Sequence, residues 1–127
     1  MQELTHYING EHVKGTSGRF ADVFNPATGE VQAKVPLASK DEMEQAVAIA
    51  AAAQPAWAAV NPQRRARVLM KFVDLLNRDM DKLAEALSRE HGKTLPDAAG
   101  DVQRGLEVVE YCIGAPQMLK GEFTDSA

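Results

Sequence analysis

The sequence has 127 residues and a mass of 13.8 kDa, enough for one domain with a hydrophobic core but too short for a two-domain enzyme of ordinary size. Hydrophobic residues make up 45% and charged residues 25% of the chain, proportions that exclude a disordered or fibrous protein. With 14 basic and 18 acidic side chains the net charge is -4, so the charge balance favours neither nucleic acid nor an anionic membrane as a partner.

Cysteine content and apolar runs indicate a soluble, cytoplasmic protein. Cys112 is the only thiol, so no internal disulfide can form, and the N-terminal residues lack the apolar core of a secretory signal. The longest apolar run, residues 46–53, is far shorter than the roughly 20 residues that cross a bilayer. We therefore expect a reducing compartment and no membrane contact.

Residues 5–37 have the composition of strands and turns. Asn9-Gly10 between two short apolar stretches predicts a hairpin with a type I′ turn, because both residues tolerate a positive φ. Its register would pair Tyr7 with His12. Residues 30–35 alternate apolar and polar side chains, which is typical of a half-buried strand, and a turn at residues 25–29 leads into them.

Residues 39–119 show helical periodicity and predict three helices. The first begins at a capping box of Ser39 and Glu42 and runs to about Trp57, where Pro55 weakens or ends its last turn. The second is one long helix from residue 62 to the region of Gly92. The third begins at Thr94 and loses regularity over residues 116–121. The fold class expected is therefore α/β, with short antiparallel strands followed by three helices in one compact unit.

The histidines are the first candidates for a metal site. In the predicted hairpin register His6 and His12 point to opposite faces of the ribbon, so they cannot share one metal ion. His91 stands alone at a helix end, where a cation interacts favourably with the helix dipole. The sequence therefore predicts no metal site.

Catalytic and cofactor-binding motifs are also missing. Cys112 lies late in the third helix, far from a helix N-terminus that could activate it, and is interpreted as a small core residue. The glycines form neither a G-x-G-x-x-G turn nor a Walker loop, so no cofactor-binding residue is predicted.

Two basic features need a specific partner. Arg64, Arg65, Arg67 and Lys71 lie at the start of the second helix, where positive charge opposes the helix dipole, and ion pairs with a neighbouring segment or subunit would offset this cost. Arg104 is the second feature, and it lies about 200° around the third helix from the apolar stripe.

Arg104 has two interpretations that the residues leave open. Asp101 three residues before it and Glu107 three residues after it favour an exposed, ion-paired arginine. The second interpretation is a carboxylate ligand, because a stripe of small residues adjoins Arg104. This small-residue stripe consists of Gly105, Val108, Cys112 and Ala115. The helical glycines 105 and 114 each cost about 1 kcal/mol relative to alanine, which close approach of a backbone or ligand would explain.

Several stretches resemble a known family in both order and spacing. They are Phe24-Asn25-Pro26-Ala27-Thr28-Gly29-Glu30-Val31, the helix ending in Trp57, Arg64-Arg65-Ala66-Arg67-Val68-Leu69 and Glu90-His91-Gly92-Lys93-Thr94. Together they resemble the N-terminal region of the aldehyde dehydrogenase superfamily. Residues 90–95, Asp97, residues 100–110 and residues 120–122 resemble more specifically the methylmalonate-semialdehyde dehydrogenases, its CoA-acylating branch.

This resemblance implies an oxidoreductase of valine catabolism. Members oxidise methylmalonate or malonate semialdehyde with NAD, lose the carboxylate as carbon dioxide or bicarbonate, and transfer the remaining acyl group to CoA, giving propionyl-CoA or acetyl-CoA. The resemblance also implies that Arg104 holds the substrate carboxylate and that the whole enzyme is a homo-oligomer. The catalytic cysteine, the general-base glutamate and the NAD-binding turn belong to later segments of the family's chain, so we expect residues 1–127 alone to bind neither NAD nor CoA and to be inactive.

The resemblance further implies that residues 120–127 begin a bridging strand and that the chain is a fragment. Two alternatives remain. One is a fragment of a non-acylating aldehyde dehydrogenase, in which Arg104 would meet no carboxylate. The other is a stand-alone helical interaction module that docks onto intact subunits.

Overall fold

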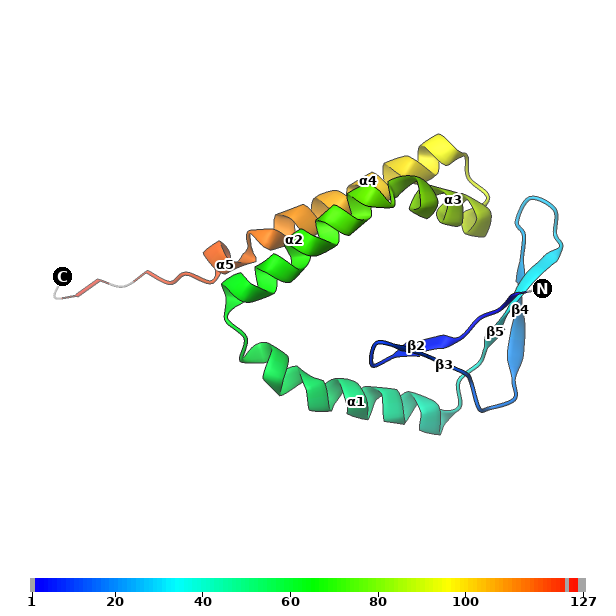
Figure 1. Cartoon of the computed structure of the whole chain (residues 1–127), viewed down its shortest axis with the longest axis horizontal. Coiled ribbons are helices and arrows are strands. Elements are labelled where there is room, and N and C mark those ends of the chain that lie inside the picture. Colours follow the sequence, from blue (N-terminus) through cyan, green and yellow to red (C-terminus); the bar gives the residue numbers. More distant parts are fainter. Residues whose placement is uncertain (1, 123, 126–127) are drawn as a thin grey trace. The chain divides into compact units, whose positions relative to one another are not determined.

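The computed structural model describes residues 2–122 and 124–125 (Figure 1). Contacts within the chain divide it into two compact units, so the single unit expected from the sequence is wrong. The first unit comprises the residues up to Ala59 together with Arg89–Gly92, and the second comprises Val60–Ser88 and the residues from Lys93 onward. None of the helices in the described part of the chain is long and apolar enough to span a bilayer.

A three-stranded sheet forms the centre of the first unit. Its strands are β1 (Gln2–Glu3), β4 (Phe20–Phe24) and β5 (Val31–Pro36), in the order β1-β5-β4. β4 pairs antiparallel with β5, as the predicted fold class requires, and Ala33 of β5 is buried. β1 adds a parallel pairing that the sequence did not indicate, because a two-residue strand carries too little pattern to be recognised.

The predicted hairpin is confirmed in both turn and register. β2 (His6–Ile8) pairs with β3 (Glu11–Val13), and Tyr7 lies opposite His12. Asn9 and Gly10 have φ values of 56° and 79°, as a type I′ turn requires.

The predicted turn at residues 25–29 forms before β5, and it lies close to Gly92. The Asn25 side chain accepts a hydrogen bond from the Ala27 N–H at 2.9 Å, and Gly29 adopts a φ of 75°. Gly92, at the predicted helix end, has a φ of 84°, and a Cβ there would lie 2.9 Å from Cγ of Pro26. A side chain at position 92 would therefore be strained and would collide with this turn.

Helix α1 (Lys40–Ala58) begins at the predicted capping box. The Glu42 carboxylate accepts hydrogen bonds from the backbone N–H groups of Ser39, at 2.8 Å, and Thr16, at 2.6 Å. These bonds, from Ser39 first and Thr16 second, lower the pKa of Glu42 to about 2. Pro55 lies inside the helix and does not end it, because α1 continues to Ala58.

The long second helix predicted from the sequence is divided in two. α2 (Pro62–Arg78) ends at Asp79, whose φ of -107° and ψ of 16° depart from helical values, and α3 (Met80–His91) follows. The Asp79 carboxylate pairs with Arg78 at 2.5 Å and Lys82 at 2.9 Å, and these hydrogen bonds lower its pKa to about 2. The apolar spacing continues through this junction, so periodicity alone concealed the break.

Helix α4 (Leu95–Ile113) confirms the predicted third helix, and the short α5 (Ala115–Met118) follows it. The described residues therefore form five helices and not the three predicted. α2 and α4 lie side by side (Figure 1), and α5 contacts both. Of the predicted bridging strand, residues 120–122 and 124–125 are in neither helix nor strand, and residues 123, 126 and 127 lie outside the described part.

The hydrophobic core is small. Among the described residues, the buried apolar side chains are Ala33, Ala66, Ala84, Ala98 and Leu106. Large apolar side chains are exposed on every major helix, and examples are Met43, Val68, Leu83 and Val108. Both units therefore present apolar surface to their surroundings.

Candidate functional site

The candidate site lies on α4, where Asp101 joins two basic side chains. Arg104 Nη1 donates to Asp101 Oδ1 at 2.5 Å, one helical turn away. Lys93 reaches the other carboxylate oxygen of Asp101 from before the helix start. The side chain of Lys93 is 21% exposed and that of Arg104 is 76% exposed, so the guanidinium is the accessible group.

The connection between α3 and α4 positions Lys93. The Ser88 hydroxyl donates to the Lys93 carbonyl at 2.7 Å. Thr94 then caps α4 by accepting a hydrogen bond from the Asp97 N–H at 3.4 Å. These bonds hold the backbone at Lys93 and Thr94, and from this position the Lys93 side chain reaches Asp101.

The sequence predicted part of this network of Asp101, Arg104 and Lys93. It identified Asp101 as a partner of Arg104, which is confirmed. It missed Lys93, because helix spacing predicts partners only within an element and Lys93 precedes α4. The other suggested partner, Glu107, accepts instead from the Gln103 side chain at 3.2 Å.

The face of α4 around Arg104 is open. All four members of the small-residue stripe are exposed, whereas Leu106 on the opposite side is 3% exposed. Cys112 is thus an exposed thiol, and its interpretation as a core residue is wrong because it lies on this outer face. Tyr111, 70% exposed, adds an aromatic ring that the sequence analysis did not single out.

The two helical glycines have different explanations. Gly114 caps α4 before α5 starts, so it does not lie in a helix interior. Gly105 lies within α4, and apart from its chain neighbours and the nearby helix backbone, a Cβ there would have no atom of the described residues within 4 Å. Open space beside Gly105 leaves room for a ligand or another segment next to Arg104.

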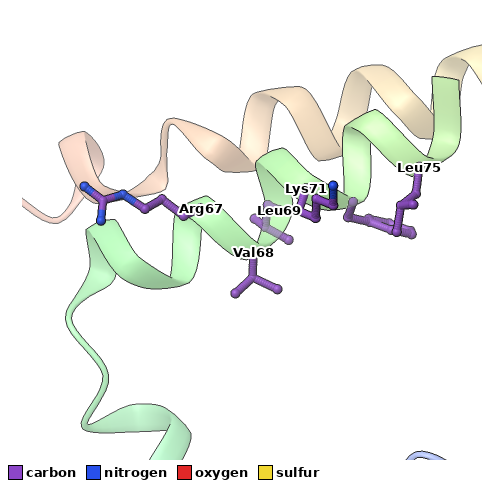
Figure 2. A pocket seen from close by; sticks show the side chains of 6 residues that line it. Arg67, Val68, Leu69, Lys71 and Leu75 are labelled. Carbon is purple, nitrogen blue, oxygen red and sulfur yellow. The ribbon is translucent and has the colours of Figure 1, made fainter. Parts of the chain in front are cut away.

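The basic residues of α2 flank an apolar groove. This α2 groove, of about 570 Å³, is lined by Arg67, Val68, Leu69, Lys71, Phe72 and Leu75 (Figure 2). Within the described residues neither Arg67 nor Lys71 forms an ion pair, and Arg65 Nε is buried without a hydrogen-bond partner. The ion pairs expected for this basic cluster therefore stay a prediction.

His6 and His12 have separate surroundings. His12 hydrogen-bonds Thr5 at 2.9 Å and its ring meets Tyr7 edge-on at 5.3 Å. His6 lines a cavity of about 140 Å³ within the first unit, and its Nε2 has no partner among the described residues. No group of three or more metal-ligating side chains occurs in residues 2–122 and 124–125.

Comparison with known proteins identifies the family. Residues 12–127 match the family described as "Aldehyde dehydrogenase family". The chain belongs to the aldehyde dehydrogenase family. The resemblance found in the motifs and the predicted fold class are thereby confirmed.

Relatives of one enzyme type recur among the similar proteins. A malonate-semialdehyde dehydrogenase of Pseudomonas aeruginosa is 50% identical over 98% of this chain and 25% of its own. A solved structure described as a methylmalonate-semialdehyde dehydrogenase of Sinorhizobium meliloti, complexed with NAD, is 63% identical with a TM-score of 0.94, covering 100% of this chain and 26% of that one. A methylmalonate-semialdehyde dehydrogenase of Oceanimonas doudoroffii is 45% identical with a TM-score of 0.91, covering 96% and 25%. The chain thus spans about a quarter of the length of these relatives.

Proposed function

We propose that this chain is the N-terminal part of a homo-oligomeric, cytoplasmic enzyme. This enzyme oxidises methylmalonate or malonate semialdehyde with NAD, releases the carboxylate as carbon dioxide or bicarbonate, and passes the remaining propionyl or acetyl group to CoA. The recurrence of this enzyme type among relatives that are 45% to 63% identical supports the assignment. Because the chain matches only a quarter of their length, residues of other segments supply the reacting groups, and these 127 residues alone are inactive.

NAD and CoA are assigned to the rest of the enzyme. A helix N-terminus binds phosphate through uncapped backbone N–H groups. Here the N-termini of α1, α2 and α4 are capped by the side chains of Ser39, Asn61 and Thr94. These helix ends do not fit a dinucleotide or CoA phosphate, so no step through either group is derived from this chain.

Arg104 is the residue of this chain that we assign to substrate. A single observation carries this assignment: the Arg104 side chain is 76% exposed, and its guanidinium is held by Asp101 beside the open space at Gly105. Arginine presents five N–H donors, so one hydrogen bond to Asp101 leaves others to receive a carboxylate in bidentate geometry. In this arrangement Arg104 would hold the carboxylate end of the semialdehyde and thereby orient its aldehyde end, while Asp101 and Lys93 would position the guanidinium.

The test is Arg104→Leu in the full-length enzyme, with malonate semialdehyde and propanal as substrates. Loss of a charge-assisted hydrogen bond, about 1.5–3 kcal/mol, should raise KM for malonate semialdehyde roughly 10- to 100-fold. Propanal has no carboxylate, so its KM should not change. Arg104→Lys should give an intermediate KM, because it keeps the charge and loses the bidentate fork.

Arg78→Leu is the matched control. Arg78 is also an exposed helical arginine paired with an aspartate at 2.5 Å, but it lies on α2. Its replacement should leave both KM values unchanged. An unchanged KM for malonate semialdehyde in Arg104→Leu would remove the carboxylate role, and free malonate in place of acetyl-CoA as product would favour the non-acylating alternative.

The proposed inactivity of the segment has its own test. The purified 127-residue chain, supplied with malonate semialdehyde, NAD and CoA, should form no NADH above a protein-free blank. NADH formation at a rate proportional to the concentration of the chain would disprove this part of the proposal.

A further inference from the structure

Arg104 contacts Asp101 through a single nitrogen. Its Nη1 donates to Asp101 Oδ1 at 2.5 Å, and among the residues that the structure describes its Nε and Nη2 have no hydrogen-bond partner. Nε and Nη2 form the edge of the guanidinium that matches both oxygens of a carboxylate. This Nε/Nη2 edge is open in the structure, although the carboxylate of Asp101 lies only one helical turn away.

Lys93 contacts the other oxygen of Asp101. Its Nζ pairs with Oδ2, and the Lys93 side chain is only 21% exposed. An ion pair that is partly shielded from water is screened less by salt than a fully exposed pair. The Ser88 hydroxyl, which donates to the Lys93 carbonyl, holds the backbone from which this side chain extends. Lys93 therefore restrains one oxygen of Asp101 and leaves Oδ1 for Arg104.

A second group of an aspartate, an arginine and a lysine has a different arrangement. Arg78 directs both Nε and Nη2 to Asp79 Oδ2, at 3.1 and 2.5 Å, so its Nε/Nη2 edge is occupied although Lys82 contacts Oδ1. The Lys82 side chain is 81% exposed and thus far less shielded than that of Lys93. Of the two groups, the one with the shielded lysine is the one whose arginine keeps an open edge.

Lys93 also determines the net charge around Arg104. Lys93 and Arg104 are cations and Asp101 is an anion, so the three side chains together carry a formal positive charge. Without the ammonium group, Arg104 and Asp101 would balance each other. Glu107, the other acidic residue one turn from Arg104, accepts a hydrogen bond from Gln103. The attraction of this site for an anion thus depends on Lys93.

We propose that Lys93 is a positioning residue that keeps the Nε/Nη2 edge of Arg104 open for the substrate carboxylate. In its absence both oxygens of Asp101 turn to Arg104, and Asp101 competes with the substrate for the guanidinium. This inference rests on the proposed role of Arg104 and adds what controls the affinity of that same site.

The test is Lys93→Met in the full-length enzyme, with malonate semialdehyde and propanal as substrates. The ratio of the two KM values is the readout, because general damage to the enzyme would change both. KM for malonate semialdehyde should rise about fivefold to tenfold relative to that for propanal, since the substrate must displace Asp101 from a bidentate pair. Lys93→Arg keeps the charge and a donor for Asp101, so its ratio should rise by less than about twofold.

Adding Asp101→Asn to Lys93→Met separates the proposed role from a purely structural one. An asparagine side chain has one acceptor oxygen and no charge, so it cannot form the competing bidentate pair. The double variant should therefore return to within about twofold of the unaltered ratio. If Lys93 only held the start of α4, removal of its partner as well would restore nothing.

Lys82→Met is the matched control. Lys82 also contacts an aspartate that pairs with an arginine, but it does so away from Arg104, and its replacement should leave the ratio unchanged. A rise in Arg104→Leu without one in Lys93→Met overturns this inference and leaves the role of Arg104 standing, whereas no rise in either removes both. The inference is also overturned if Lys82→Met acts like Lys93→Met or if the double variant is not restored.

Discussion

Helices α1 and α4 have the same length and the same kind of start, but they differ in what they bury. Each has 19 residues, and each begins with a hydroxyl, of Ser39 or Thr94, that accepts a hydrogen bond from a backbone N–H three residues on. α4 buries Ala98 and Leu106, whereas α1 buries no residue. The comparison teaches that a helix start is a local property, whereas burial depends on which partner the helix meets.

The largest effect should come from the buried side of α4. Leu106→Ala should lower the free energy of unfolding by about 2–4 kcal/mol, because it removes a packed side chain and leaves a cavity. Val47→Ala on α1 removes an exposed side chain and should change it by less than about 0.5 kcal/mol. Urea denaturation of the 127-residue chain at one fixed concentration measures both. Equal losses would mean that α1 is packed as closely as α4.

The caps should matter equally in the two helices. Ser39→Ala and Thr94→Ala each remove a side-chain acceptor from a helix start, and each should cost about 1 kcal/mol. Urea denaturation followed by circular dichroism is the measurement, with Gln54→Ala in the interior of α1 as a substitution that leaves both caps intact. A loss confined to Thr94→Ala would show that the α1 cap forms only when tertiary contacts support it.

Acid should weaken the α1 cap, because this cap carries a carboxylate whose pKa is lowered to about 2. The ordinary value of this Glu42 carboxyl is 4.5. Its stabilising effect is therefore complete above pH 4.5 and is lost as the pH falls from 4.5 toward 2. Unfolding measured against pH should show this loss, and Glu42→Gln should flatten it. Glu44→Gln should keep the acid dependence, and if it does not, the assignment to Glu42 is wrong.

The smallest effect should come from the exposed pair Lys40–Glu44 on α1, at 3.4 Å. Glu44→Ala should cost about 0.3–0.5 kcal/mol at low salt, since an exposed i,i+4 pair is weak. Added salt should reduce the difference further. A cost that approaches that of cap removal would indicate that Glu44 contacts more than Lys40.

Much of the candidate site could be read from residues close in sequence. The ion pair of Arg104 with Asp101 follows from their spacing on one helix, and Thr94 with Asp97 marked the start of that helix. Lys93 and the exposure of Cys112 were not predicted. The contact of Lys93 with Asp101 depends on the conformation of the connection before α4. The exposure of Cys112 depends on which side of α4 packs against α2.

The sequence by itself determined the local structure of this protein. Positive φ at Asn9-Gly10, the cap at Ser39 and the helix end at Gly92 each follow from backbone sterics or a hydrogen bond between near neighbours. Only the tertiary structure decided that the long second helix divides at Asp79, that β1 joins β5 in parallel, and which face of each helix is buried. These features depend on contacts between distant residues, and an apolar stripe predicts that a face needs a partner without specifying which segment provides it.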